Sequence, residues 1–230
     1  MRVHVAFTPA EAAEAPIGIV VDVLRATSTI AQALAGGYRR VLCCGEVDEA
    51  RALRGEIGDG LLAGERLCVR IPGFDLGNSP SEFAEAAGET VILSTTNGTR
   101  ALVTAASRCE RVLAGSLLNL AAVVAAARES GEDVAVFCAG VKGEFAMDDA
   151  YVAGRIVELL DGEGTDAARA ALRLARSFDS AEEGLRASQS ARNLLNAGLE
   201  ADIAWCARES SLDVVPRFVG MHGSAAEIAR

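Results

Sequence analysis

Apart from arginine, this sequence has few residues that carry positive charge. A single lysine, Lys142, stands beside 21 arginines, and the two histidines are His4 and His222. The formal net charge of −10 argues against a nucleic-acid partner, because binding a phosphate backbone needs a basic surface. With only two histidines, a mechanism through a phosphohistidine intermediate is also disfavoured. An anionic ligand would have to be met locally by arginines, helix N-termini or a bound cation.

The cysteines are scattered and form no CxxC pair. None has a histidine at metal-ligand spacing, so neither a disulfide framework nor a zinc ribbon is expected. The sequence shows no cationic start followed by a long apolar run, and no apolar stretch of about 18 residues, so no membrane span or export signal is predicted. Reduced thiols in a cytoplasmic protein are the expectation. The six cysteines are Cys43, Cys44, Cys68, Cys109, Cys138 and Cys206.

Several well-known motifs for phosphate chemistry are missing. No cysteine is followed by arginine at the sixth position, as cysteine phosphatases require, and no P-loop with its lysine occurs. Asp22 follows a predicted strand, as does the nucleophile of haloacid-dehalogenase-type phosphatases. Those enzymes have a second aspartate two positions on, where this chain has Leu24. All three chemistries are therefore disfavoured.

Short β-branched runs alternate with stretches rich in alanine and leucine, which is typical of a parallel sheet covered by helices. With 230 residues, half of them hydrophobic, the chain is long enough for one compact α/β domain over 1–230. After Asp148 the pattern predicts an almost entirely helical chain. The predicted strands are Ile17–Val23, Val41–Cys44, Leu61–Ala63, Thr90–Leu93, Arg111–Ala114 and Asp133–Cys138. The predicted helices among them are Thr27–Ala35, Val47–Arg54, Thr99–Ala106 and Leu117–Arg128.

A weak internal repeat appears when the chain is shifted by about 71 residues, the length of two βα units. Val20-Val21 then falls on Val91-Ile92, and Arg40-Val41-Leu42 falls on Arg111-Val112-Leu113. Two related βαβ-type halves, about 1–88 and 89–230, would explain this match. Chance likeness between two unrelated βαβ units is the open alternative.

The first chemically rich turn follows the first predicted strand. In open α/β sheets, ligands bind beyond the carboxyl ends of strands, where helix N-termini present free N–H groups. Here Asp22 and Arg25 are followed by three hydroxyls that lead into a helix. Hydroxyls and free N–H groups bind phosphate oxygens, and a guanidinium forks two of them. The hydroxyls are those of Thr27, Ser28 and Thr29; ordinary helix capping is the competing interpretation.

A second polar turn lies at the next strand-to-helix junction of this kind. Gly98 lets the backbone approach a ligand closely, and Arg100 follows in the first helical turn. The remaining residues of this turn are Ser94, Thr95, Thr96, Asn97 and Thr99. Between the two turns, a loop rich in glycine, proline and aspartate carries Asn78 and is a candidate substrate-contact loop.

Acidic residues gather in two further loops. Glu144 lies in a glycine-rich loop, and Asp148 and Asp149 follow where a helix begins, a position that the helix dipole favours by itself. Glu65 follows a short predicted strand. Oxygen ligands of this kind suit Mg²⁺, which usually takes one or two carboxylates together with water and substrate oxygens.

Taken in order, these segments resemble the ComB-like 2-phosphosulfolactate phosphatases along most of the chain. The matching segments are Asp22-Val-Leu-Arg-Ala-Thr-Ser-Thr29, Gly64-Glu65, Asp75-Leu-Gly-Asn-Ser-Pro80, Ser94-Thr-Thr-Asn-Gly-Thr99, Cys138-Ala-Gly140 with Gly143-Glu-Phe145, and Asp213-Val-Val-Pro216. The resemblance implies a three-layer α/β/α fold, dependence on Mg²⁺, and hydrolysis of phosphosulfolactate to sulfolactate on the route to coenzyme M.

The resulting hypothesis assigns a role to each polar segment. Asp22, Arg25 and Glu144 are the candidate catalytic residues, and Asp22, Glu65 and Asp148 the candidate Mg²⁺ ligands. Arg25, Thr27 and Ser28 are expected to hold the phosphoryl group of a small anionic phosphorylated substrate. Its sulfonate and carboxylate end is expected to be received by Ser94, Thr95, Thr96, Asn97, Gly98, Thr99 and Arg100, and Thr29 and Asn78 are further candidate substrate contacts. The nucleophile is either a metal-activated water or Asp22 itself.

Two alternatives remain open at this stage. The chain could be a non-catalytic protein that binds phosphorylated or sulfonated acids, although the acidic residues would then have no role. Its assembly is also open, and a homodimer is one option.

Overall fold

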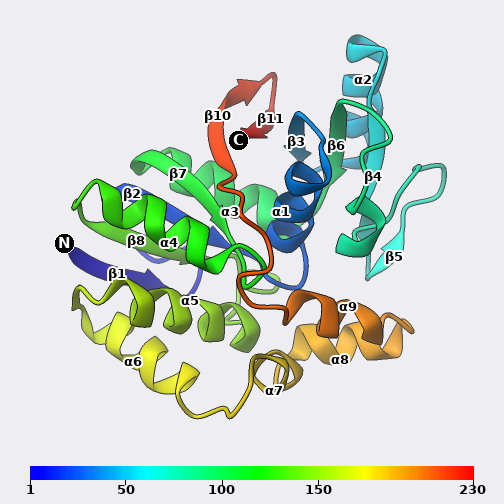
Figure 1. Ribbon diagram of the computed structural model, residues 1–230. Coiled ribbons are helices and arrows are strands. Elements are labelled where there is room, and N and C mark those ends of the chain that lie inside the picture. Colours follow the sequence, from blue (N-terminus) through cyan, green and yellow to red (C-terminus); the bar gives the residue numbers. More distant parts are fainter.

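The computed structural model describes residues 1–230 and contains one sheet of 11 strands with helices on both faces (Figure 1). The strand order is β5-β4-β6-β3-β11-β10-β7-β2-β8-β1-β9. The strands are β1 (Arg2–Ala6), β2 (Ala15–Val21), β3 (Arg40–Cys44), β4 (Leu61–Arg66), β5 (Val69–Arg70), β6 (Thr90–Ser94), β7 (Cys109–Gly115), β8 (Val134–Cys138), β9 (Glu163–Gly164), β10 (Arg217–His222) and β11 (Ala225–Ala229).

The helices follow most strands and supply the covering layers. They are α1 (Ala26–Gly36), α2 (Val47–Ile57), α3 (Asn97–Ala106), α4 (Leu120–Glu129), α5 (Met147–Leu160), α6 (Asp166–Ala175), α7 (Ala181–Arg186), α8 (Gln189–Asn196) and α9 (Glu200–Cys206), with a 3₁₀ turn η1 (Pro80–Phe83). The expected α/β class and the helix layers on both faces of the sheet are confirmed. No helix is long and apolar enough to cross a bilayer.

The sheet consists of two parallel groups joined by one antiparallel hairpin. In the first group β6 pairs in parallel with β4 and β3, and in the second β2 pairs in parallel with β7 and β8. The hairpin of β10 and β11 lies between β3 and β7 and is antiparallel to both. The sheet is therefore mostly parallel, as predicted.

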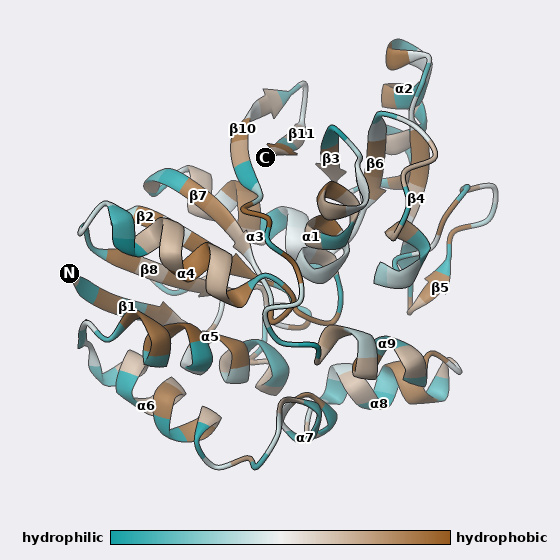
Figure 2. Ribbon diagram, viewed as in Figure 1, coloured by the Kyte–Doolittle hydropathy of each residue, from teal (hydrophilic) through white to brown (hydrophobic).

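The sheet curls around two helices. One buried cluster joins Val20 of β2 and Val41 of β3 to Ile30 of α1 and Leu102 of α3, so the inner faces of both groups pack on the same two helices. The outer face of the second group is covered by α4, α5 and α6, and that of the first by α2. Figure 2 shows apolar residues along the central strands and many hydrophilic ones on α2 and α6.

The C-terminal end of α1 is explained by a glycine. α1 ends where Gly37 takes φ of 111°, and its N–H bonds the carbonyls of Ala33 and Leu34. A left-handed residue at this position terminates a helix and favours glycine because glycine has no Cβ. The predicted end of this helix near Gly36-Gly37 is confirmed.

The elements also reflect the spacing of the sequence repeat. α1 begins at Ala26 and α3 begins 71 residues later at Asn97, and β3 and β7 contain Arg40 and Arg111 at the same spacing. In the sheet, strands of 1–88 and 89–230 are interleaved at two places: β6 lies between β4 and β3, and β2 lies between β7 and β8. Each parallel group therefore needs strands from both segments.

Three parts of the chain differ from the sequence prediction. The predicted helical character after Asp148 is wrong for β10 and β11, which are strands. β1 was not predicted, and the loop after β4 contains the short β5 and η1. The sequence of β10, Arg-Phe-Val-Gly-Met-His, has a glycine between its apolar residues and polar residues at both ends, so it lacks the continuous apolar run of the buried central strands.

Candidate functional site

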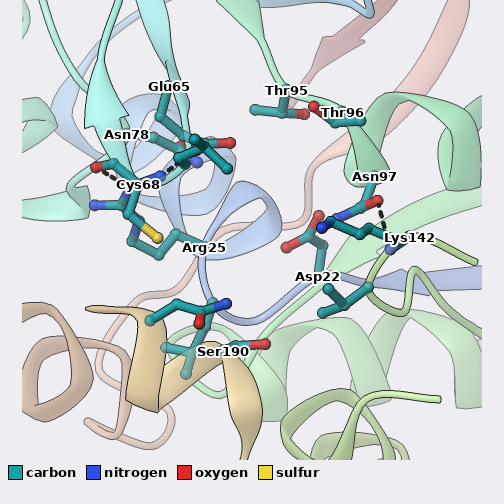
Figure 3. A pocket seen from close by; sticks show the side chains of 14 residues that line it. Asp22, Arg25, Glu65, Cys68, Asn78, Thr95, Thr96, Asn97, Lys142 and Ser190 are labelled. Atoms are coloured by element: carbon teal, nitrogen blue, oxygen red, sulfur yellow. Dashed lines mark hydrogen bonds between the residues drawn. The ribbon is translucent and has the colours of Figure 1, made fainter. Parts of the chain in front are cut away.

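A polar pocket of about 180 Å³ lies where the loops after β2, β4, β6 and β8 meet α8 (Figure 3). Ligand sites of α/β proteins form at such loops beyond the carboxyl ends of strands. The polar lining residues are Asp22, Arg25, Glu65, Asn78, Thr95, Thr96, Asn97, Lys142, Ser190 and Asn193, with Cys68 and three apolar residues completing it. A second cavity of about 470 Å³ adjoins it and shares Val141, Lys142, Ser190 and Asn193.

Asp22 lies at the base of α1 with its two carboxylate oxygens in different environments. Oδ1 accepts the backbone N–H of Ala26 at 3.2 Å. Oδ2 faces Gly98 so closely that a Cβ on Gly98 would lie 2.9 Å from it. The absence of a side chain at Gly98 therefore leaves room for Oδ2 at the junction of α1 and α3.

The environment of Asp22 raises its pKa to about 7. Burial is the main cause because it disfavours the charged carboxylate, and the carboxylates of Asp148 and Glu65 add repulsion. The Ala26 N–H and the Arg25 guanidinium act in the opposite direction. A carboxyl group with a pKa near neutrality in a pocket is suited to exchange protons at physiological pH.

Two further aspartates support the same region from α5. Ser190 donates a hydrogen bond to Asp148 Oδ1 at 3.1 Å, and burial raises the pKa of Asp148 to about 6. Asp149 accepts the backbone N–H groups of Val23 and Gly140, each at 3.0 Å. Burial raises the pKa of Asp149 well above its usual value, with Asp148 and Asp22 adding repulsion. Asp149 thus ties the loop after β2 to the loop after β8.

The predicted Mg²⁺ ligands were tested against this geometry. Asp22 and Glu65 line the same pocket, while Asp148 lines the adjoining cavity. No three His, Cys, Asp or Glu side chains gather closely enough to form a complete metal site. Mg²⁺ needs only one or two protein carboxylates, and the repulsion that raises the pKa of Asp22 is what a cation would relieve. The residues therefore fit a magnesium ion that shares its shell with water or substrate.

Arg25 lines the pocket, but its guanidinium is already engaged. Nη1 lies 2.6 Å from Asp202 Oδ2 in an ion pair whose two side chains are almost fully buried. Nη1 also donates to Ser79 Oγ, and Nη2 donates to the carbonyl of Cys68. The Ser79 hydroxyl donates to the same oxygen of Asp202 at 2.8 Å. Arg25 is thus held in one orientation by α9 and by the loop that precedes η1.

The three hydroxyls after Arg25 do not reach the pocket. Thr27, Ser28 and Thr29 are completely buried. The Thr27 hydroxyl accepts the N–H of Asp22, while Ser28 and Thr29 donate to backbone carbonyls. Direct substrate contact by these side chains is therefore corrected to a structural role: they fix the turn that presents Asp22.

The second polar turn is divided between lining and supporting residues. Thr95, Thr96 and Asn97 line the pocket. Ser94 and Thr99 are buried behind it, where Ser94 accepts a hydrogen bond from Arg66 and Thr99 donates to the carbonyl of Cys44. Arg100 is exposed and lines neither cavity. The expected substrate contacts of Ser94, Thr99 and Arg100 are corrected accordingly.

Asn78 is 4% exposed and lines the pocket, and its Oδ1 is buried without a hydrogen-bond partner. A buried polar atom without a partner is costly, and at a pocket wall it marks a place for a ligand or water. Asn78 is also fixed through its backbone, because its carbonyl accepts the Thr29 hydroxyl at 2.9 Å.

Glu144 is exposed and lines only the adjoining cavity, so it does not share the pocket of Asp22 and Arg25, the other two candidate catalytic residues. It closes a tight turn in which its backbone exchanges two hydrogen bonds with Val141, each 3.0 Å. The polar residue of this loop that lines the pocket is Lys142, next to the apolar Val141. It was not predicted as a site residue, although its being the only lysine was a signal.

Comparison with known proteins gives a consistent result. The family described as 2-phosphosulpholactate phosphatase matches residues 4–220. A "Probable 2-phosphosulfolactate phosphatase" of Carboxydothermus hydrogenoformans is 40% identical over 94% of this chain and 92% of its own length. Proteins with the same description from Thermus thermophilus and Thermotoga petrophila are 40% and 39% identical, over 98% and 94% of this chain and 98% and 95% of their own.

Proposed function

Because the chain belongs to the 2-phosphosulpholactate phosphatase family, we propose that it hydrolyses the phosphate ester of 2-phosphosulfolactate, or of a similar small phosphorylated acid, to the free hydroxy acid and phosphate. It is thus a phosphoric monoester hydrolase. The observation that carries this proposal beyond the family is the pocket itself, where Asp22 and Lys142 on one side face Glu65 and Arg25 on the other around a space of small-molecule size.

Phosphate monoesters hydrolyse extremely slowly in water, so most of the catalysis must come from positioning and charge. We propose that Asp22 and Glu65 hold Mg²⁺ and that Asp148, which lines the adjoining cavity, is a third candidate ligand. When bound, the ion would neutralise phosphoryl oxygens and lower the pKa of a coordinated water. Arg25, held by Asp202, would add a fixed donor to the phosphoryl group.

Asp22 is the residue for which two chemical roles stay open. As a general base it would accept a proton from the attacking water, whose oxygen forms the new bond to phosphorus while the ester bond breaks and the departing oxygen takes up a proton from solvent. As a nucleophile, one of its own oxygens would attack phosphorus and form an aspartyl phosphate, which water would then cleave. Acid quenching during turnover of ³²P-labelled substrate separates these roles, since only the second transfers the labelled phosphoryl group to Asp22.

The test of the function is release of inorganic phosphate from 2-phosphosulfolactate and from a panel of phosphorylated C3 and C4 acids. We expect release that EDTA abolishes and excess Mg²⁺ restores. Tight binding of these acids without any phosphate release would instead identify a non-catalytic binding protein. Release that EDTA leaves unchanged would contradict the magnesium part of the proposal alone.

We also propose a cytoplasmic location, which the six free cysteines support. Coenzyme M synthesis is the route that the family resemblance suggests for the product, and a homodimer is the assembly that a solution mass measurement would test.

A further inference from the structure

The substrate class of the proposed function carries unusually high negative charge. 2-Phosphosulfolactate, which the relatives' description names, bears a carboxylate and a sulfonate in addition to its phosphate. The pocket itself presents two carboxylates, Asp22 and Glu65. The positive charge of a bound divalent cation would therefore be balanced by these carboxylates and the phosphate, with none left over for the other anionic groups. The remaining anionic groups need positive charge of their own.

Two positively charged side chains line the pocket, and only one of them is paired with a carboxylate of the protein. The charge of Arg25 is compensated by the buried carboxylate of Asp202 at 2.6 Å. Lys142 takes part in no ion pair of the structure. Of the side chains that line this pocket, Lys142 is therefore the one with positive charge available to a ligand; Arg192, which also takes part in no ion pair, lines only the adjoining cavity.

The backbone places Lys142 firmly although its side chain is exposed. Val141 and Glu144 exchange two backbone hydrogen bonds across a two-residue turn, in which Lys142 has φ of 55° and Gly143 has φ of 83°. Positive φ at both central positions is the geometry of a tight type I′ hairpin turn. The N–H of Lys142 also donates to Asn97 Oδ1 at 3.4 Å, which joins this turn to the loop after β6.

Lys142 lies at the boundary of the two cavities and lines both of them. Figure 3 shows it with Asp22 and Asn97 on the side of the pocket that faces Arg25, Glu65 and Asn78. A substrate whose phosphate occupies the Asp22–Arg25 region would extend its other substituents towards this boundary.

We propose that Lys142 is a specificity-determining residue that binds the second anionic group of the substrate, its sulfonate or its carboxylate, and not the phosphate. The inference rests on the proposed function. This role suits lysine better than arginine. The ammonium group of lysine is compact and sits on a flexible chain, so it can bind a sulfonate or carboxylate, whereas a guanidinium favours two parallel hydrogen bonds to a phosphate.

The experiment measures kcat and KM of wild type and Lys142→Met on four phosphate esters. These are 2-phosphosulfolactate, 2-phospholactate without the sulfonate, 2-(phosphonooxy)ethanesulfonate without the carboxylate, and p-nitrophenyl phosphate without either group. We expect kcat/KM on the full substrate to fall by about tenfold in Lys142→Met, mainly through KM, because one charge-assisted contact is lost. The truncated ester that lacks the partner of Lys142 should be hydrolysed equally by both proteins.

Lys142→Arg keeps the charge and should retain most of the affinity. Arg173→Met is the matched control, because Arg173 is exposed on α6, takes part in no ion pair and lines neither cavity, so only the net charge changes. An equal loss on all four esters would place Lys142 on the phosphate, and no loss on the full substrate would remove it from the site; either result overturns the inference. If wild type hydrolyses none of the four, the proposed function fails, and calorimetric binding of the same compounds to both proteins still decides the role of Lys142.

Discussion

At the scale of single residues, the site depends on how the two oxygens of Asp22 are separated. Oδ1 is tied to the first N–H of α1, and Oδ2 lies against Gly98 at the start of α3. The carboxylate is thereby fixed at the meeting point of two helix N-termini, where the partial positive charge of both helices favours an anion. The pKa of Asp22 is nevertheless raised, because burial and the neighbouring carboxylates destabilise the charged form more than the helix N-termini stabilise it.

Asp22→Asn should abolish turnover while leaving the fold intact. We expect kcat to fall by about 10³-fold or more, because the amide neither accepts a proton nor attacks phosphorus. Asn Oδ1 can still accept the N–H of Ala26, so circular dichroism should be unchanged. Activity close to wild type would remove Asp22 from the reaction.

The same variant has a predicted effect on stability, measured by urea unfolding in EDTA. The folded-state pKa of Asp22 is raised from 3.8 to about 7. The unfolded chain therefore binds fewer protons between these values, and this residue costs stability as the pH rises through them. Asp22→Asn removes that cost, so it should be more stable than wild type at pH 8 and equal to it near pH 3. The opposite order at pH 8 would contradict the burial argument.

Gly98→Ala tests the close contact between α1 and α3. A Cβ at this position would lie 2.7 Å from the Cβ of Ala26 and 2.9 Å from Asp22 Oδ2, both closer than van der Waals contact allows. We expect the Asp22 carboxylate to be displaced and kcat/KM to fall by about tenfold or more, since small misplacements of a reacting group are costly.

Gly55→Ala is the control for Gly98→Ala. Gly55 lies inside α2 with no atom within 4 Å of an added Cβ, so alanine should stabilise this helix by about 0.5–1 kcal/mol and leave kcat/KM unchanged. Equal kinetics in both variants would show that the contact at Gly98 does not matter.

The sequence correctly predicted those pocket residues whose side chains have no evident role in local backbone structure. Asp22 and Glu65, carboxylates at the ends of predicted strands, and Asn78 in a turn-rich loop all line the pocket. It failed for Thr27, Ser28 and Thr29, because a hydroxyl at a helix start serves a ligand and a backbone turn equally well, and burial decides between them. Ser190 and Asn193 were missed as pocket residues because only tertiary packing brings α8 to the loops of the sheet.

At the scale of elements, the structure joins the short C-terminal helices to the site through one buried ion pair. Asp202 of α9 and Ser79 before η1 hold Arg25 from two sides. Asp202→Ala should destabilise the protein by about 3–5 kcal/mol, because it leaves the Arg25 charge buried without a partner. The measurement is the urea midpoint and slope together with phosphate release.

Two companion variants make the result of Asp202→Ala interpretable. The double variant Arg25→Met with Asp202→Leu removes both charges and should recover much of the stability but not the activity, since no guanidinium then faces the substrate. Asp48→Ala breaks the exposed pair with Arg51 and should change the urea midpoint little. A small effect of Asp202→Ala on both stability and activity would show that Arg25 does not depend on α9.

Most elements of the sheet and its covering helices were predictable because short apolar strands alternate with helical stretches rich in alanine and leucine. The hairpin of β10 and β11 was not, because its place is set by the gap between β3 and β7 and not by its own sequence. Alternating half-buried residues such as those of β10 become a strand only when two unpaired edges are available on either side.

At the scale of the whole molecule, the segments 1–88 and 89–230 cannot be cut apart without breaking the sheet. β6 fills the space between β4 and β3, and β2 fills the space between β7 and β8. The buried cluster around α1 and α3 likewise draws on both segments, with Ile30 and Leu102 in the same core. A fragment of 1–88 would expose two strand edges and the inner face of α1, and a fragment of 89–230 would lack the central strand of its larger group.

We therefore expect the full chain to unfold in one cooperative urea transition and neither fragment, 1–88 nor 89–230, to show such a transition alone. The physical reason is that each fragment would have to leave apolar strand faces and backbone hydrogen-bonding groups unpaired, a loss larger than the few kcal/mol by which a domain is stable. Mixing the fragments should restore near-ultraviolet circular dichroism, because the missing strands are then supplied in trans. A cooperative transition in the isolated 1–88 fragment would show that the first segment has a core of its own, and the alternating strand order would then reflect docking of two preformed halves and not a shared fold.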